Sequence, residues 1–265
     1  MTRFDAFEVE ALNARFRGAA PEAILAFALE TFPGTLAFAC SFGLEDVLLV
    51  DLLDGLGTRP RAFFLDTGRL PQETYDTAAR IRARYRLPIA TFFPNHEAVQ
   101  AYVDAHGPNA FFESLELRRA CCHLRKVEPL QRALAGAEAW ITGLRREQAP
   151  TRANLGPFEL DWTHRGILKI NPLVDWELEQ VRAYLRVHDV PTNPLHERGY
   201  PSLGCAPCTR AVAPGEDQRA GRWWWEAPEH KECGLHAGVG RQASGVGPRS
   251  PGIAPSSPSS PKPHE

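Results

Sequence analysis

Short apolar runs alternate with amphipathic stretches from residue 35 onward, and this alternation constrains the fold of the 265-residue chain more than any other feature. The apolar, strand-like runs span residues 35–40, 61–65, 89–93 and 139–142. The helical patterns span about residues 44–56, 71–86, 96–106 and 114–135. Strands that alternate with helices along a chain form parallel sheets with helices on both faces. We therefore expect an α/β fold with a parallel, doubly wound sheet.

Polar or glycine-containing turns follow three of the expected strands. Open α/β sheets bind their ligands at the carboxyl ends of the strands, so these turns supply candidate substrate contacts. A turn that leads into a helix can also offer backbone N–H groups to a phosphate. The candidates from these turns are Ser41, Gly43, Asp66, Thr67, Gly68 and Gly143.

The chain divides into three parts. Residues 1–30 are expected to form an N-terminal helical segment. Residues 31–239 are expected to form one domain, which contains a helix at about 175–188 and a mobile, catalytic C-terminal segment that starts at about residue 210. Residues 240–265 are rich in Pro, Ser and Gly, so they cannot bury enough apolar surface to fold and are expected to be a disordered tail.

Bulk charge and hydropathy argue against several classes of partner. The formal net charge is only −2, which gives no sign of a nucleic-acid or membrane-surface protein. No apolar run reaches the roughly 20 residues of a membrane-spanning helix. The acidic start of the chain lacks the charged-then-apolar pattern of an export signal. We expect a cytoplasmic protein and leave its oligomeric state open, homo-oligomers included.

Four of the six cysteines occur in two pairs. Cys121 and Cys122 are neighbours inside a helical pattern, whereas Cys205 and Cys208 form a C-x-x-C motif. Neighbouring helical side chains point about 100° apart, which suits separate corners of a 4Fe-4S cluster better than the knuckles of a zinc site. We expect these four thiolates to hold one cluster per chain. A zinc site, and burial as ordinary apolar side chains, are the alternatives.

The two remaining cysteines differ in their surroundings. Cys40 ends an apolar strand and is expected in the core. Cys233 lies close to Lys231 and His236, and a nearby cation lowers the pKa of a thiol and so favours the nucleophilic thiolate. Cys233 is therefore the candidate nucleophile. His236 is a candidate to orient or protonate groups beside it, or is simply solvated.

Seven short motifs together resemble one known family, the thioredoxin-dependent sulfonucleotide reductases, and within it the iron-sulfur branch that reduces adenosine 5′-phosphosulfate (APS). The resemblance covers roughly residues 35–238. The motifs lie at residues 65–69, 121–126, 140–146, 196–200, 204–210, 221–226 and 231–236. No single motif is specific, but the ordered set is.

The resemblance implies a fold of the adenine-nucleotide alpha hydrolase type, related to the ATP pyrophosphatases. In those enzymes the loop after the first strand reads S-G-G-x-D-S. The corresponding residues 41–46 read Ser-Phe-Gly-Leu-Glu-Asp, which departs from that pattern. This departure argues against an intact pyrophosphate-binding loop and against ATP-dependent adenylation.

The resemblance also implies an activity, in which APS is reduced to sulfite and AMP during assimilatory sulfate reduction and cysteine biosynthesis. Cys233 would carry an S-sulfocysteine intermediate, and thioredoxin would be the electron donor. Reduction of the 3′-phosphorylated substrate (PAPS), or of both nucleotides, is the nearest alternative. A nucleotide-binding or zinc-stabilised regulatory module is an alternative from outside the enzymes.

An anionic mixed anhydride requires fixed cations. The candidate cations are Lys126, Arg145, Arg146, Arg152, Arg219 and Arg222. The family's contacts match four of these, namely Lys126, Arg152, Arg219 and Arg222. Lys126 follows Cys122 by one helical turn, so cluster and substrate are expected to share it. The other basic residues of that stretch are expected on a solvated helix face, and they are Arg118, Arg119, Arg125 and Arg132.

Overall fold

A six-stranded, mostly parallel sheet forms the centre of the computed structural model, which describes residues 4–57, 59–149, 152–227, 230–231 and 234–235. The strands are β1 (Leu36–Ala39), β2 (Arg61–Leu65), β3 (Ile89–Phe92), β4 (Ala139–Ile141), β5 (Phe158–Asp161) and β6 (Ile167–Ile170). Their order is β3-β2-β1-β4-β6-β5, and only β5 pairs antiparallel, with β6. The expected α/β class and the four expected strands are confirmed. Strands β5 and β6 were not among the expected strands.

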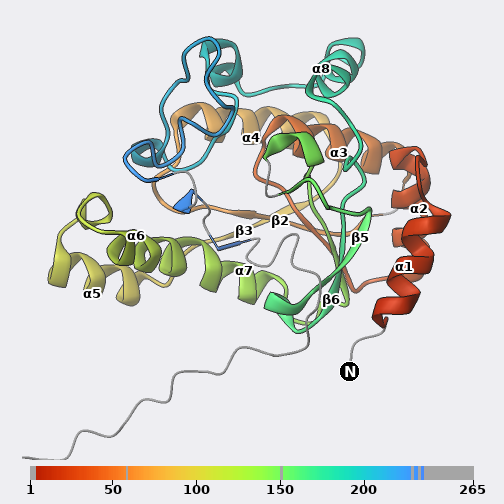
Figure 1. Ribbon diagram of the computed structural model, residues 1–265, viewed down its shortest axis with the longest axis horizontal. Coiled ribbons are helices and arrows are strands. Elements are labelled where there is room, and N and C mark those ends of the chain that lie inside the picture. Colours follow the sequence, from red (N-terminus) through yellow and green to blue (C-terminus); the bar gives the residue numbers. More distant parts are fainter. Residues whose placement is uncertain (1–3, 58, 150–151, 228–229, 232–233, 236–265) are drawn as a thin grey trace, which may run out of the picture.

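Helices cover both faces of this sheet (Figure 1). One layer consists of α1 (Ala6–Arg15), α2 (Pro21–Thr31), α3 (Leu44–Gly55), α4 (Gln72–Arg84) and α8 (Leu178–Val187). The opposite layer consists of α5 (His96–His106), α6 (Leu115–Cys122) and α7 (Glu128–Ala133). Short 3-10 turns lie at Ala110–Phe112, Arg146–Gln148, Trp162–His164, Pro194–Arg198 and Ala206–Cys208. No helix in the described part of the chain has the length and apolar character that crossing a membrane requires.

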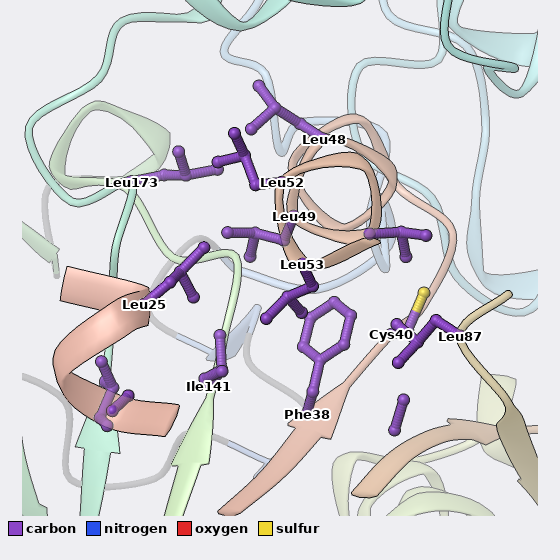
Figure 2. Packing of buried hydrophobic residues seen from close by; sticks show 14 of the residues in the cluster. Leu25, Phe38, Cys40, Leu48, Leu49, Leu52, Leu53, Leu87, Ile141 and Leu173 are labelled. Atoms are coloured by element: carbon purple, nitrogen blue, oxygen red, sulfur yellow. The ribbon is translucent and has the colours of Figure 1, made fainter. Parts of the chain in front are cut away.

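Helix α3 is the centre of the larger core. Its leucines, among them Leu49 and Leu53, are fully buried and pack toward Phe38 of β1 and Ile141 of β4 (Figure 2). Burying such side chains contributes about 2 kcal/mol each, so this packing fixes the helix firmly. The N-terminus of α3 is thereby held at the carboxyl ends of β1 and β4. That edge of the sheet is where the expected substrate contacts lie.

The helix expected over residues 114–135 is interrupted directly after the cysteine pair. Helix α6 ends at Cys122, a π-helical turn spans His123–Val127, and α7 follows. Pro129 has no N–H to donate to the carbonyl of Arg125, which removes one α-helical hydrogen bond at this point. A π turn changes which side chains share a face, and such turns are frequent at functional sites.

Asp161, His164 and Lys169 form a buried polar cluster at strands β5 and β6. Asp161 accepts a hydrogen bond from Nδ1 of His164 at 2.9 Å, and Nζ of Lys169 lies 3.7 Å from the same carboxylate. All three side chains are at most 4% exposed. Burial raises the pKa of Asp161, but the His164 hydrogen bond and the Lys169 charge outweigh it and leave the pKa below its ordinary value of 3.8.

We predict that Asp161→Asn lowers the free energy of unfolding at pH 7 by about 3 kcal/mol, because Lys169 then lies buried without its carboxylate. A depressed carboxyl pKa stabilises the fold above pH 3.8, and this contribution is lost as the pH falls from there through the folded-state pKa. The difference between variant and wild type should therefore shrink in that range. Urea unfolding over a pH series measures it, with exposed Asp104→Asn as the control. Equal stability of the two variants would contradict the prediction.

Candidate functional site

A cavity of about 270 Å³ opens at the carboxyl ends of β1, β2 and β4. Ser41, Gly43, Thr67 and Gly143, from the turns after these strands, line it as expected. Asp66 and Gly68 do not line it. Asp66 instead accepts hydrogen bonds from the Gly68 N–H and the Tyr75 hydroxyl, both at 2.8 Å, and so shapes the turn.

The carboxylate of Asp46 holds the turn after β1 by accepting hydrogen bonds from Ser41. Both the N–H and the hydroxyl of Ser41 donate to Asp46 at 2.6 Å. Burial raises the pKa of Asp46 to about 6 in spite of these hydrogen bonds, so a share of this carboxyl is neutral near physiological pH. Gly143 packs against this turn, where a Cβ would lie 2.8 Å from Cβ of Glu45. Only glycine permits that approach of the β1 and β4 turns.

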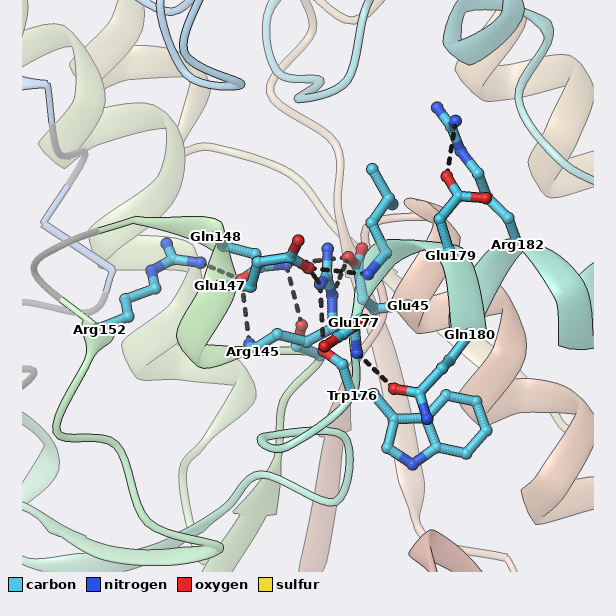
Figure 3. A network of polar contacts seen from close by, with 12 residues as sticks. Glu45, Arg145, Glu147, Gln148, Arg152, Trp176, Glu177, Glu179, Gln180 and Arg182 are labelled. Atoms are coloured by element: carbon cyan, nitrogen blue, oxygen red, sulfur yellow. Dashed lines mark hydrogen bonds and ion pairs between the residues drawn. The ribbon is translucent and has the colours of Figure 1, made fainter.

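Arg145 belongs to a polar network beside the cavity (Figure 3). Its Nε donates to Glu45 at 2.8 Å, its Nη1 donates to Glu147 at 2.7 Å, and its side chain is 1% exposed. Arg145 also lines the cavity, where two carboxylates pair with its guanidinium. Gln148 donates to Glu45 at 3.0 Å and accepts a hydrogen bond from Arg152. Gln148 thereby orients Arg152 at the cavity, a role that no sequence motif indicated.

Arg146 points away from the cavity. It forms an ion pair with Asp175 and donates to the Leu155 carbonyl at 2.7 Å. Arg146 was one of the candidate cations named from the sequence. In the turn after β4, neighbouring residues face opposite sides, and only tertiary packing decides which side faces the cavity.

Two arginines of the C-terminal segment line the cavity as expected. Nη1 of Arg222 donates to the Leu203 carbonyl at 2.7 Å. The guanidinium passes directly over Gly204, where any Cβ would collide with it. Nη2 of Arg219 donates to the Lys231 carbonyl at 2.8 Å.

The predicted nucleophile Cys233 and the predicted His236 lie outside the described residues, but the chain close to Cys233 is placed on both sides. The Lys231 carbonyl is held by Arg219, and Lys231 Nζ donates to the Ala220 carbonyl at 3.2 Å. Leu235 lines the cavity and packs against the apolar cluster of β2, β4 and α7. Leu235 thus lies at the cavity, and Lys231 contacts Arg219, which lines it.

The two cysteine pairs meet although more than 80 residues separate them in sequence. All four cysteines are buried and line one small cavity, together with Lys126 and other basic or aromatic side chains. Lys126, 8% exposed, lines this cavity and the larger one as well. In the described residues, no group of three or more His, Cys, Asp or Glu side chains is arranged to hold a metal ion.

The surroundings of the cysteines fit thiolate ligands. Burial raises the pKa of Cys205, but Lys126 and the Thr67 hydroxyl, 3.2 Å from the sulfur, lower it below the ordinary value. Burial and the neighbouring Cys205 raise the pKa of Cys208 to about 12. Trp223 also lines this cavity, and its buried Nε1 has no hydrogen-bond partner among the described residues. An indole N–H of this kind can donate to a cluster sulfur.

Two basic residues that were assigned to a solvated helix face are in fact part of the site. Arg118 is 1% exposed and pairs with Glu226. Arg125 lines the cysteine cavity and donates to the Thr67 carbonyl at 2.7 Å. Arg119 is exposed, and Arg132 is paired with Glu128 at the surface, as expected for that face. The helical pattern could not predict the burial of Arg118 and Arg125 because their partners come from distant segments.

His196 is a further residue that the sequence reading did not assign. It lines the larger cavity, and its Nδ1 lies 2.9 Å from the Tyr200 carbonyl and therefore carries the proton. Burial lowers the pKa of His196, so the neutral ring leaves Nε2 as an acceptor. That nitrogen has no partner in the described part of the chain. His196 begins the motif at residues 196–200, which could have marked it as a site residue but was used only for the family resemblance.

Comparisons with known proteins agree with this geometry. The phosphoadenosine phosphosulfate reductase domain matches residues 35–211. An adenosine 5′-phosphosulfate reductase of Burkholderia cepacia is 57% identical over 199 residues, which covers 75% of this chain and 79% of the relative. One from Allochromatium vinosum is 52% identical over 202 residues and covers 76% and 78%.

Solved structures point to the same fold. The phosphoadenylyl-sulfate (PAPS) reductase of Candida auris superposes with a TM-score of 0.68 at 30% identity, over 79% of this chain and 98% of that one. The yeast FAD synthetase shares only the fold, with a TM-score of 0.51 at 15% identity over 80% and 70% of the two chains. The chain therefore belongs to the phosphoadenosine phosphosulfate reductase family, in the branch of the adenosine 5′-phosphosulfate reductases.

Proposed function

We propose that this protein reduces APS to sulfite and AMP in sulfate assimilation, with thioredoxin as the electron donor. The observation that carries the proposal is that Lys126 lines both the larger cavity and the cavity of the four cysteines. In this proposal Lys126 lies between the iron-sulfur site in the cysteine cavity and the anion-binding site in the larger cavity. The names of the curated relatives support the choice of APS. Reduced thiols require a reducing compartment, so we place the enzyme in the cytoplasm.

The larger cavity has the size and charge for a nucleotide bearing a sulfated phosphate. Pockets for ligands of this size are mostly apolar with a few placed polar groups, and here β2 supplies apolar wall from Phe63 and Leu65. Four basic side chains meet the anionic end, and they are Lys126, Arg152, Arg219 and Arg222. Planar guanidinium groups suit oxyanions because they donate two parallel hydrogen bonds. The turn residues Ser41, Gly43, Thr67 and Gly143 contact the nucleotide in this proposal, whereas Asp66 and Gly68 support the turn from behind.

The chemistry proceeds in two displacements. The thiolate of Cys233 attacks the sulfate sulfur, the bond from that sulfur to the phosphate oxygen breaks, and AMP leaves with the bonding electrons. Cys233 then carries an S-sulfonate. A thioredoxin thiolate attacks the Cys233 sulfur and expels sulfite, and the second thioredoxin thiol resolves the mixed disulfide. Two electrons pass from the thioredoxin dithiol to the sulfur of the substrate.

Cys121, Cys122, Cys205 and Cys208 would hold one 4Fe-4S cluster. When bound, the cluster supplies a fixed charge distribution beside Lys126 and ties two distant segments together. The Thr67 hydroxyl at Cys205 and the indole of Trp223 would help to hold it there. Lys126 stabilises the charge that develops on the departing AMP and on the sulfonate. His236 would orient or protonate groups beside Cys233.

We predict about four iron and four sulfide per chain in anaerobically purified protein, since thiolate ligation of a cubane cluster requires four cysteines. Metal and sulfide analysis measures this, together with the brown colour of the protein. Replacing Cys205 with serine should lower both contents, whereas the core variant Cys40→Ser should retain them. One zinc per chain and no sulfide would contradict the cluster and favour the zinc alternative.

We predict that Lys126→Ala retains iron and sulfide but lowers kcat about 100-fold or more, because a fixed cation acts on charge that develops in the transition state. Steady-state kinetics with APS and reduced thioredoxin measures the effect. Arg132→Ala, a change at an exposed cation of α7, is the matched control and should leave kcat unchanged. An unchanged kcat for Lys126→Ala would remove this lysine from the mechanism.

We predict that enzyme mixed with APS, without thioredoxin, gains one sulfonate group on a peptide containing Cys233 and releases one equivalent of AMP. Cys233→Ser should bind APS and retain the cluster, yet form no adduct and no sulfite. Peptide mass spectrometry locates the adduct. The same experiment with PAPS tests the alternative substrate, for which we expect much slower adduct formation. Turnover by Cys233→Ser, or sulfonate on Cys40, would contradict the mechanism.

A further inference from the structure

The reaction just proposed makes no use of Arg118, although this residue carries the most completely buried charge near the cysteines. Arg118 lies in α6, four residues before Cys122, and its side chain is 1% exposed. A buried charge costs free energy unless its partners compensate for the lost water. The identity of those partners therefore indicates what the residue does.

Arg118 contacts one distant stretch of the chain, at Trp223, Glu226 and His230. Nε donates to Glu226 Oε1 at 2.8 Å, and Nη2 donates to Glu226 Oε2 at 2.6 Å. The carboxylate is 7% exposed, and a two-point contact of this kind fixes direction as well as distance. Nη2 also donates to the His230 carbonyl at 2.7 Å, and the guanidinium carbon lies 4.8 Å from the Trp223 ring centre.

The same guanidinium reaches the cysteine cavity. Arg118 lines that cavity together with Cys122 of its own helix and Cys208 of the distant pair. The backbone N–H of Trp223 also donates to the Cys208 carbonyl at 3.2 Å. Trp223, Glu226 and His230 thus connect this stretch to both cysteine pairs, through Arg118 of α6 and through the Cys208 carbonyl.

This attachment limits how far the candidate nucleophile can travel. Cys233 follows His230 by three residues and Trp223 by ten. An extended chain spans at most about 3.5 Å per residue, so Cys233 stays within about 11 Å of His230 while Arg118 holds that carbonyl. Release of Glu226 and His230 would leave the contacts of Lys231 with Arg219 and with the Ala220 carbonyl as the attachment nearest to Cys233. With fewer attachments the chain before Cys233 samples more positions, which lowers the effective concentration of the thiolate at the substrate.

We propose that Arg118 is a positioning residue for the nucleophile. Through Glu226 and the His230 carbonyl it fixes the point from which the chain carries Cys233 to the sulfate sulfur. The inference rests on the proposed function, because it requires Cys233 to carry the intermediate. It also explains why the charge is buried beside a cluster ligand and not placed at the surface.

The test uses the full chain with its cluster and measures single-turnover adduct formation with APS in the absence of thioredoxin. The double variant Arg118→Met/Glu226→Leu removes both charges at once, and such apolar replacements often preserve stability. Glu226→Gln keeps the shape of the side chain while weakening the pair. Arg119→Met, at the exposed neighbour in α6, is the matched control.

We expect the double variant to form the Cys233 adduct about 10- to 100-fold more slowly, since small misplacements of reacting groups have effects of this size. Glu226→Gln should show a smaller loss in the same direction. The dissociation constant for APS, the iron content and the melting temperature should stay close to those of wild type. Trypsin cleavage after Lys231 should become faster in both variants.

Three outcomes would count against the proposal. Adduct formation at the wild-type rate in both variants would show that Arg118 does not position Cys233. A loss of APS affinity as large as the loss of rate would place the pair in substrate binding. If Arg119→Met slowed adduct formation by the same factor, the loss of a positive charge, and not the position of Arg118, would explain the effect. If wild-type enzyme itself forms no adduct, it is the proposed function that fails.

Discussion

The cost of burying positive charge governs the arrangement of this site. An isolated cation cannot leave water unless an anion or hydrogen-bond acceptor replaces its hydration. Arg118 and Arg145 are each 1% exposed, and each is held by carboxylates from elsewhere in the chain, Glu226 for the first and Glu45 with Glu147 for the second. These internal ion pairs stabilise the segments that surround the two cavities. The cations that line the cavity are then held in fixed positions around it.

The ion pairs also connect segments that share no secondary structure. Glu45 begins α3, and Arg145 follows β4, so their pairing joins the turns of two adjacent parallel strands. Arg118 joins the cysteine helix to the segment that leads to the nucleophile. The cysteine pairs add a third connection between α6 and the stretch after residue 203. The irregular C-terminal stretch is thus ordered by buried polar contacts and not by strands or helices.

Several parts of the fold and the site could be predicted from sequence because their causes are local. Short apolar runs and amphipathic runs of helical period predicted β1 to β4 and the helices between them. The two cysteine pairs were singled out because they stand in short, contiguous motifs, and the arginines at 219 and 222 were singled out through the family resemblance. Residues whose role depends on a distant partner could not be found in this way. Arg118 and Arg125 were placed on a solvated face, and Gln148 was not singled out at all.

The sequence by itself determined the α/β class, the ends of the strands where the site forms, and the set of thiols and cations available to it. Tertiary structure decided which of those groups face the cavity. Arg145 and Arg146 are neighbours, yet one borders the cavity and the other pairs with Asp175 away from it. The π-helical turn after Cys122 set the direction of Lys126. The physical reason is that local propensity follows from neighbouring residues, whereas the direction and partner of a buried charge follow from whatever segment packs against it.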